Sequence, residues 1–108
     1  MKINVATKLL DMDGKEIPAS AEPDAEPVTL CKIAVEALMG IYKDEPDLSG
    51  EEKVKRFKLA MKLRDGDEPD LEVEELALIK KLIGKAFPSP LVVARCFDIL
   101  DGHAPAAA

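Results

Sequence analysis

The chain has 108 residues, of which 47% are hydrophobic and 33% charged, and its 21 acidic against 15 basic residues give a net charge of −6. This composition excludes an intrinsically disordered chain and is sufficient for one compact core. The acidic balance repels phosphate backbones and anionic membranes at long range, so neither nucleic acid nor a membrane is the expected partner.

Aromatic side chains are scarce, because the chain has no Trp, one Tyr and three Phe. The core must therefore be filled mainly by aliphatic side chains, which favours helices over a β-sandwich. We expect a mainly α (α+β) fold, in which an N-terminal β-hairpin precedes a compact bundle of about four helices. No apolar run approaches the roughly 18 residues of a membrane span, and no signal-peptide pattern opens the chain, so the cytoplasm is the expected location.

Residues 1–18 are expected to form the β-hairpin. Apolar and polar side chains alternate from Ile3 to Leu9, and the dipeptide Asp13-Gly14 is typical of a two-residue hairpin turn, since Gly adopts positive φ without strain. Pro18 limits the length of the returning strand, because proline has no N–H to donate to a partner strand.

Residues 19–28 are rich in Ala, acidic residues and proline and have no apolar periodicity, so we expect a mobile acidic loop. Residues 29–102 are expected to form the helical bundle, and 1–102 a single globular domain. The last six residues, 103–108, follow an Asp-Gly pair and have no apolar pattern, so we expect a disordered tail.

Three hydroxyl side chains are placed to start helices. Thr29 precedes the first apolar-periodic segment, Ser49 opens a Ser-x-x-Glu capping box, and Ser89 precedes a proline at the first position of the last helix. In the second helix, one apolar face is expected to carry Val54, Phe57, Ala60 and Met61, with Leu59 and Leu63 beside them.

One pentapeptide occurs twice. Asp44-Glu45-Pro46-Asp47-Leu48 recurs as Asp67-Glu68-Pro69-Asp70-Leu71, 23 residues later, and each copy precedes an expected helix. The repeat indicates either a duplicated helical unit or two helix starts that use the same capping chemistry, since acidic residues near a helix N-terminus oppose its dipole favourably. The sequence leaves both readings open.

The residues that usually carry catalysis are missing or badly placed. The only histidine, His103, lies in the expected tail, and Cys31 and Cys96 belong to no metal or redox motif, so both are expected to pack as small hydrophobic side chains. Whether the two cysteines are ever linked stays open. Asp65-x-Asp67 resembles the start of a calcium-binding loop, but Asp70 stands where that loop needs glycine. We therefore expect no catalytic residue, no metal and no cofactor, and a protein that is not an enzyme.

Two segments are candidates for contact with a protein partner. The second helix concentrates basic residues, and Lys55, Arg56, Lys58 and Lys62 are the candidates for a charged partner surface. The alternative for these cations is a solvated face paired with nearby acids. The other candidate is the hairpin edge, with Ile3, Val5 and Thr7, because an uncovered strand edge offers backbone groups for strand addition.

The sequence resembles a known group of proteins at three places. These are Gly50-Glu51-Glu52-Lys53-Val54-Lys55-Arg56-Phe57-Lys58-Leu59-Ala60, the stretch 78–87 with the sequence LIKKLIGKAF, and Pro90-Leu91-Val92-Val93. The chain from residue 1 to 102 is similar to small proteins encoded in tailed phages and prophages. The resemblance implies an origin, and a location in the cytoplasm of a bacterial host, but no activity, cofactor or catalytic residue.

Two functions compete if the resemblance holds. The first is a non-enzymatic accessory protein that acts by protein–protein binding, for instance in virion tail assembly, where it would shield an apolar surface of a structural subunit. The alternative is an inhibitor or modulator of a host enzyme or defence complex, acting as an acidic nucleic-acid mimic. The mimic requires the acids of 44–52 and of 65–75 to lie together at one end of the molecule, whereas the accessory protein requires an exposed apolar patch.

Overall fold

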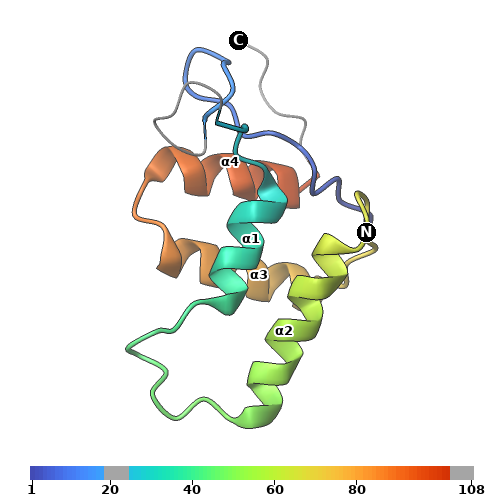
Figure 1. Cartoon of the computed structure of the whole chain (residues 1–108), viewed down its shortest axis with the longest axis vertical. Coiled ribbons are helices and arrows are strands. Elements are labelled where there is room, and N and C mark those ends of the chain that lie inside the picture. Colours follow the sequence, from blue (N-terminus) through green and yellow to red (C-terminus); the bar gives the residue numbers. More distant parts are fainter. Residues whose placement is uncertain (19–24, 103–108) are drawn as a thin grey trace.

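The computed structural model describes residues 1–18 and 25–102, and within them the protein is a bundle of four α-helices (Figure 1). The helices are α1 (Leu30–Met39), α2 (Gly50–Arg64), α3 (Val73–Ala86) and α4 (Pro90–Leu100). The predicted mainly helical class is therefore confirmed. None of these helices has the length and the apolar character needed to cross a bilayer.

Three helices begin at the predicted hydroxyl caps. The side-chain oxygens of Thr29, Ser49 and Ser89 each accept a bond from the N–H three residues on, at 3.3, 3.1 and 3.4 Å. The third helix, α3, begins differently, because the carboxylate of Glu75 accepts the backbone N–H of Glu72 at 2.9 Å. In each case a side chain satisfies an N–H that the first turn of a helix leaves without a backbone acceptor.

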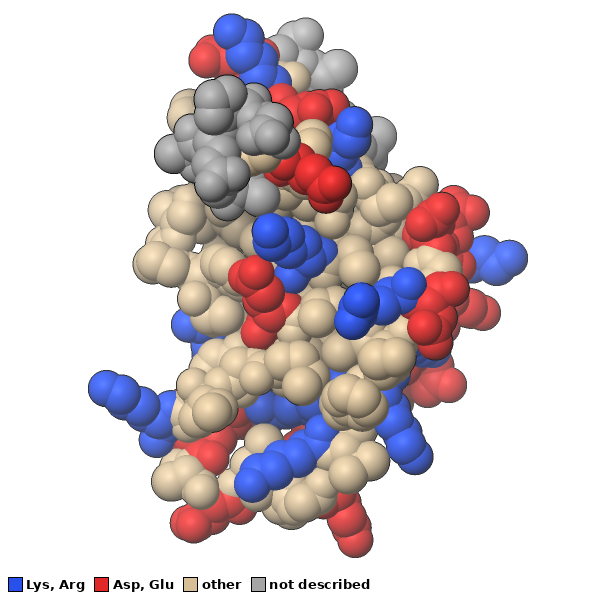
Figure 2. Space-filling model, in the orientation of Figure 1, with Lys and Arg blue, Asp and Glu red and all other residues tan. Residues whose placement is uncertain are grey.

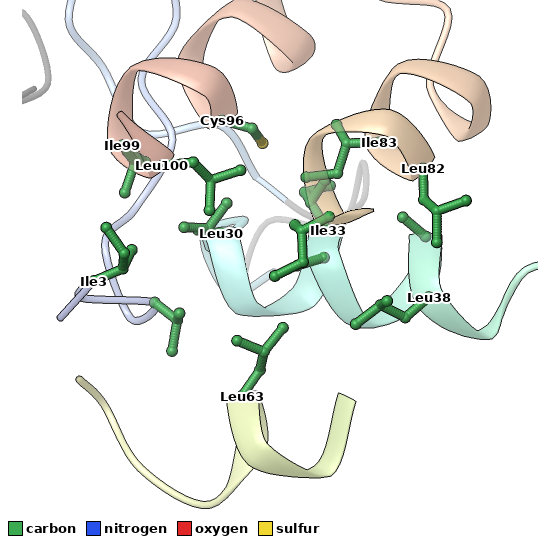
Figure 3. Close-up of a cluster of buried hydrophobic side chains, with 14 of the residues drawn as sticks. Ile3, Leu30, Ile33, Leu38, Leu63, Leu82, Ile83, Cys96, Ile99 and Leu100 are labelled. Carbon is green, nitrogen blue, oxygen red and sulfur yellow. The ribbon is translucent and has the colours of Figure 1, made fainter. Parts of the chain in front are cut away.

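The centre of the fold is α1, which packs against both α2 and α3, while α4 packs against α3. Five of its ten residues are buried: Leu30, Ile33, Ala34, Ala37 and Leu38. They join buried side chains from the other three helices and from the N-terminal segment in one apolar cluster (Figure 3). The central helix thus fixes the relative positions of α2 and α3.

The predicted β-hairpin does not form. Backbone pairing in the described residues is limited to isolated bridges, although the chain does turn between Asp11 and Lys15, with Gly14 at a φ of 79°. The N–H of Ile17 bonds to the carbonyl of Leu9 at 3.1 Å, but the reciprocal bond is missing because Val28 lies between them. The N–H of Val28 donates to the carbonyl of Ile17 at 2.7 Å, and the carbonyl of Val28 accepts from the N–H of Leu9 at 2.9 Å. A third segment therefore uses the groups that a hairpin ladder would have paired.

The first nine residues are held on two sides instead. The N–H groups of Ile3 and Val5 bond to carbonyls of the loop 67–69, at 3.2 and 2.8 Å. The carbonyls of Val5 and Thr7 accept the N–H groups of the first two residues of α1, at 2.8 and 3.0 Å. Because those N–H groups have no acceptor within the helix, the N-terminal segment completes the start of α1.

Part of the predicted loop 19–28 can be compared with the structure. Residues 19–24, like the predicted tail 103–108, lie outside the described residues. In the described part, Pro27 forms a bridge with Pro18, and Val28 is bonded to the N-terminal segment as above. The end of the predicted loop is thus part of the packed structure.

Candidate functional site

The surface that differs most from expectation lies on α2. Among the other three helices, α2 packs chiefly against α1, and it lies at one side of the bundle in Figure 1. Its buried residues are Arg56, Leu59, Ala60 and Leu63. Since this stripe covers only one side of the helix, the opposite side of α2 faces solvent.

Three apolar side chains occupy that opposite side. Val54, Phe57 and Met61 expose 51%, 50% and 39% of their surface, and their spacing of three and four residues places them in one row. We call this row the outer face of α2. The sequence pattern places Ala60 on the same face as these three residues, but Ala60 is buried together with Leu59 and Leu63, so the structure divides that face.

Unpaired cations border the outer face of α2. Lys53, Lys55, Lys58 and Arg64 are exposed, and none has a carboxylate of the described residues within 4.0 Å. With 3.6 residues per turn, Lys53 and Arg64 lie on one side of the row, and Lys55 and Lys58 on the other. In Figure 2, surface of uncharged residues, drawn in tan, lies between Lys and Arg side chains in the lower part of the molecule, where α2 runs.

A hollow flanks α2 on each side. One, of about 390 Å³, is lined by Val54, Lys55, Lys58 and Leu59 of α2 and by Glu75 of α3, among others. The second, of about 420 Å³, lies between the C-terminal end of α1, the connection 40–48, and two residues of α2, Lys53 and Arg56. The helix therefore forms a ridge between two depressions.

The four basic candidates from the sequence have different positions. Lys55 and Lys58 are exposed beside the outer face of α2. Lys62 is tied to α3, since its Nζ lies 2.9 Å from Oε1 of Glu75. Arg56 is only 4% exposed and lies in the protein rather than at its surface. Two of the four thus remain available to a partner, and both belong to one surface.

Arg56 has a structural role. Its Nη1 and Nη2 donate to the two carboxylate oxygens of Glu45, at 3.0 and 2.7 Å, and its Nε lies 3.6 Å from Oε1 of Glu52. These hydrogen bonds hold the pKa of the Glu45 carboxyl below its ordinary value. Asp44, the neighbouring acid, pairs with Lys85 of α3 at 2.9 Å. The connection between α1 and α2 is thus fixed to α2 and α3 by charge pairs.

The N-terminal candidates do not form an open edge. Ile3 and Val5 are each 2% exposed, and their N–H groups are bonded to the loop 67–69. The backbone N–H of Thr7 bonds to the carbonyl of Asn4 at 3.3 Å, and its own carbonyl accepts from α1. The premise of strand addition, an uncovered edge at these residues, is therefore not met.

The two cysteines are separate thiols. Cys96 is fully buried in α4, and burial raises the pKa of its thiol to about 12. Cys31 is partly buried, and burial also raises the pKa of its thiol. In the described residues, no three His, Cys, Asp or Glu side chains are grouped so that they could hold a metal ion.

The acids expected to lie together are far apart. Residues 44–52 and 65–75 lie at opposite ends of α2, a helix of 15 residues that spans about 21 Å. The charge pairs agree with this separation. Asp44 pairs with Lys85, which lies near the C-terminal end of α3, whereas Glu75, which pairs with Lys62, lies near the N-terminal end of α3. In Figure 2, acidic and basic side chains alternate on the face shown. The condition that the mimic function sets, a joint acidic end of the molecule, is therefore not met.

Comparison of the chain with protein-family models, with curated protein sequences and with solved structures finds no match. The site therefore has to be read from its own geometry. Sequence reasoning identified the cations of α2 and grouped Val54, Phe57 and Met61, but it did not predict that these three side chains are exposed. The sequence does contain a signal for this exposure. The apolar residues of α2 fall on two opposite sides, and a helix at the edge of a bundle can bury only one of them.

Proposed function

We propose that this protein is a non-enzymatic accessory protein that acts by binding another protein through the outer face of α2. The observation that supports the proposal is the exposed row of Val54, Phe57 and Met61 between unpaired cations. Apolar side chains grouped on the surface of a small monomer are typical of interaction sites, since their exposure to water costs free energy that a partner recovers.

The resemblance to small phage and prophage proteins suggests the kind of partner. In virion assembly, a structural subunit has to be kept from polymerising until its apolar surfaces are needed. A small helical protein with an exposed apolar row could cover such a surface. We therefore propose a virion subunit, for instance of the tail, as the partner. The alternative function as an acidic mimic has no support from the arrangement of the acids, which lie at both ends of α2.

The experiment is a pull-down with three forms of the tagged protein: the wild type, Phe57→Gln, and Met12→Gln as the matched control. Met12 is 87% exposed and lies in the turn 11–15, away from α2, so its substitution removes a similar exposed apolar side chain elsewhere. The lysate comes from bacterial cells in which the phage or prophage is induced, and bound proteins are identified by mass spectrometry.

We expect a virion subunit to be retained by the wild type and by Met12→Gln, and to be lost with Phe57→Gln. The proposal fails if no virion subunit is retained, or if Phe57→Gln retains it as well as the wild type does. Circular dichroism is used to check that the variants keep the wild-type fold. We expect them to keep it, because Phe57 is half-exposed and Met12 is exposed.

A further inference from the structure

We propose that the occupant of the outer face of α2 is an acidic amphipathic α-helix supplied by the partner protein. This inference rests on the proposed function and specifies the chemistry of the partner. Three properties of the surface support it: the kind of backbone contact it permits, its shape, and its charge.

The backbone of this region permits side-chain packing but not strand addition. An extended peptide binds strongly when its backbone pairs with unpaired N–H and C=O groups. The groups of α2 are bonded within the helix, and the bonds of Ile3, Val5 and Thr7 described above occupy the N-terminal segment. A helix needs no such groups, because its own backbone is satisfied internally. The partner element that suits this surface is therefore a helix.

The shape of α2 also suits a helix. Val54, Phe57 and Met61 form a straight row that spans about 10 Å, or two helical turns. Helices pack by placing the side-chain ridge of one into the groove of the other, and the hollows of about 390 and 420 Å³ lie beside this ridge. A helix lying along α2 would cover the row and fill part of a hollow. It would give the outer face of α2 a neighbour that the bundle does not provide.

The charge of the surface selects an acidic partner. The α2 sequence contains six of the 15 basic residues and only two of the 21 acidic ones. Lys53, Lys55, Lys58 and Arg64 have no ion pair among the described residues, so carboxylates beside the partner's apolar row would find four cations. A second copy placed with its own α2 on this face would bring like charges together, which opposes self-association there.

The net negative charge of the protein outside α2 also favours a partner element that contacts only α2. Outside α2, nine basic residues stand against 19 acidic ones. An extended anionic surface, such as a membrane or a nucleic acid duplex, would be repelled by those acids. A single acidic helix touches only α2 and its borders, so it gains the local attraction without that repulsion.

The test uses the full chain, labelled with ¹⁵N, and two synthetic peptides of about 18 residues, long enough to become helical on binding. Both peptides have Leu at helical spacing, and Glu flanks the Leu row in the first while Lys flanks it in the second. The acidic peptide is expected to shift the amide resonances of residues 53–64. The Phe57→Gln variant is expected to bind it at least about tenfold more weakly, and Met12→Gln is expected to bind it as the wild type does.

A charge reversal makes the test independent of Phe57. The double variant Lys55→Glu, Lys58→Glu is expected to lose the acidic peptide and to gain the basic one. Equal binding of both peptides to the wild type would overturn the inference, as would a lack of any shift with the acidic peptide. Shifts in residues 53–64 caused only by vesicles of phosphatidylglycerol, or only by duplex DNA, would overturn it in favour of those ligands.

The failure of this inference can be told from failure of the proposed function. If a virion subunit is retained in a Phe57-dependent manner but the acidic peptide does not bind, the face binds protein by another kind of element. If retention of the subunit does not depend on Phe57, the proposed function itself fails.

Discussion

The guanidinium of Arg56 binds the carboxylate of Glu45, eleven residues earlier in the chain, through two hydrogen bonds of 3.0 and 2.7 Å. This pair fixes the connection between α1 and α2 against α2, and it leaves Arg56 only 4% exposed. Among the basic residues of α2, Arg56 therefore has a structural role. Its burial also sets the rotation of α2, because the side of the helix opposite Arg56 and Leu63 has to face solvent.

Replacement of Arg56 is expected to destabilise the fold. Arg56→Ala removes the partner of Glu45 and the buried alkyl part of the side chain, and breaking a buried ion pair in this way costs roughly 3–5 kcal/mol of the free energy of unfolding. Lys55→Ala, one residue away and exposed, is expected to change it by less than about 0.5 kcal/mol. Urea unfolding measures both values. Equal effects of the two substitutions would contradict the structural role of Arg56.

The pair also predicts a dependence on pH. Because Arg56 lowers the pKa of Glu45 in the folded state, the pair stabilises the fold fully above the ordinary glutamate pKa of about 4.3, and this stabilisation is lost as the pH falls through the lowered value. We expect the wild type to exceed Glu45→Gln in stability at pH 7 and the difference to shrink below about pH 4. Thermal unfolding of both proteins from pH 7 to pH 3 measures it. A difference that stays constant over this range would refute the assignment.

The rotation of α2 about its own axis, which buries Leu59 and exposes Phe57, can be tested separately by substituting these two side chains. Leu59 is 4% exposed and Phe57 50% exposed. Leu59→Ala is expected to lower the free energy of unfolding by about 2–4 kcal/mol, because a buried side chain leaves a cavity. Phe57→Ala is expected to cost well below half as much, although phenylalanine is the larger residue. If Phe57→Ala has the greater effect, α2 buries the side that carries Phe57 and not the side that carries Leu59.

The thiols are expected to react at different rates. Burial raises the pKa of Cys96 to about 12, so at pH 8 only about one molecule in ten thousand carries the thiolate, and the side chain is also inaccessible. A disulfide reagent is expected to modify Cys31 slowly and Cys96 only after unfolding. Measurement on the wild type and on Cys31→Ser assigns each rate. Rapid modification of Cys96 in the folded protein would show that α4 is not packed as described.

The sequence was sufficient to locate the helices but not to orient the second one. Capping depends on residues close in the chain, and so Thr29, Ser49 and Ser89 could be identified from their neighbours. The hairpin could not be judged in this way, because Val28, which interrupts it, lies outside the pattern of alternation.

The orientation of α2 depends on contacts that a helical period does not contain. Its two apolar stripes are equivalent in sequence, and the choice between them follows from Arg56, whose partner Glu45 lies in the preceding connection. The repeated pentapeptide shows the same limit. Glu45 in the first copy is paired with Arg56, whereas the matching Glu68 is exposed, so identical local sequences have different roles.

The most direct test of the central claim is photo-cross-linking from position 57. A photoreactive phenylalanine analogue, p-benzoylphenylalanine, replaces Phe57 in one protein and the exposed Met12 in another, and both are irradiated in bacterial cells that assemble the virion. We expect position 57 to form a covalent adduct with a virion subunit and position 12 to form none. An adduct from position 12 alone, or the same adduct from both positions, would contradict the claim that the outer face of α2 is the binding surface.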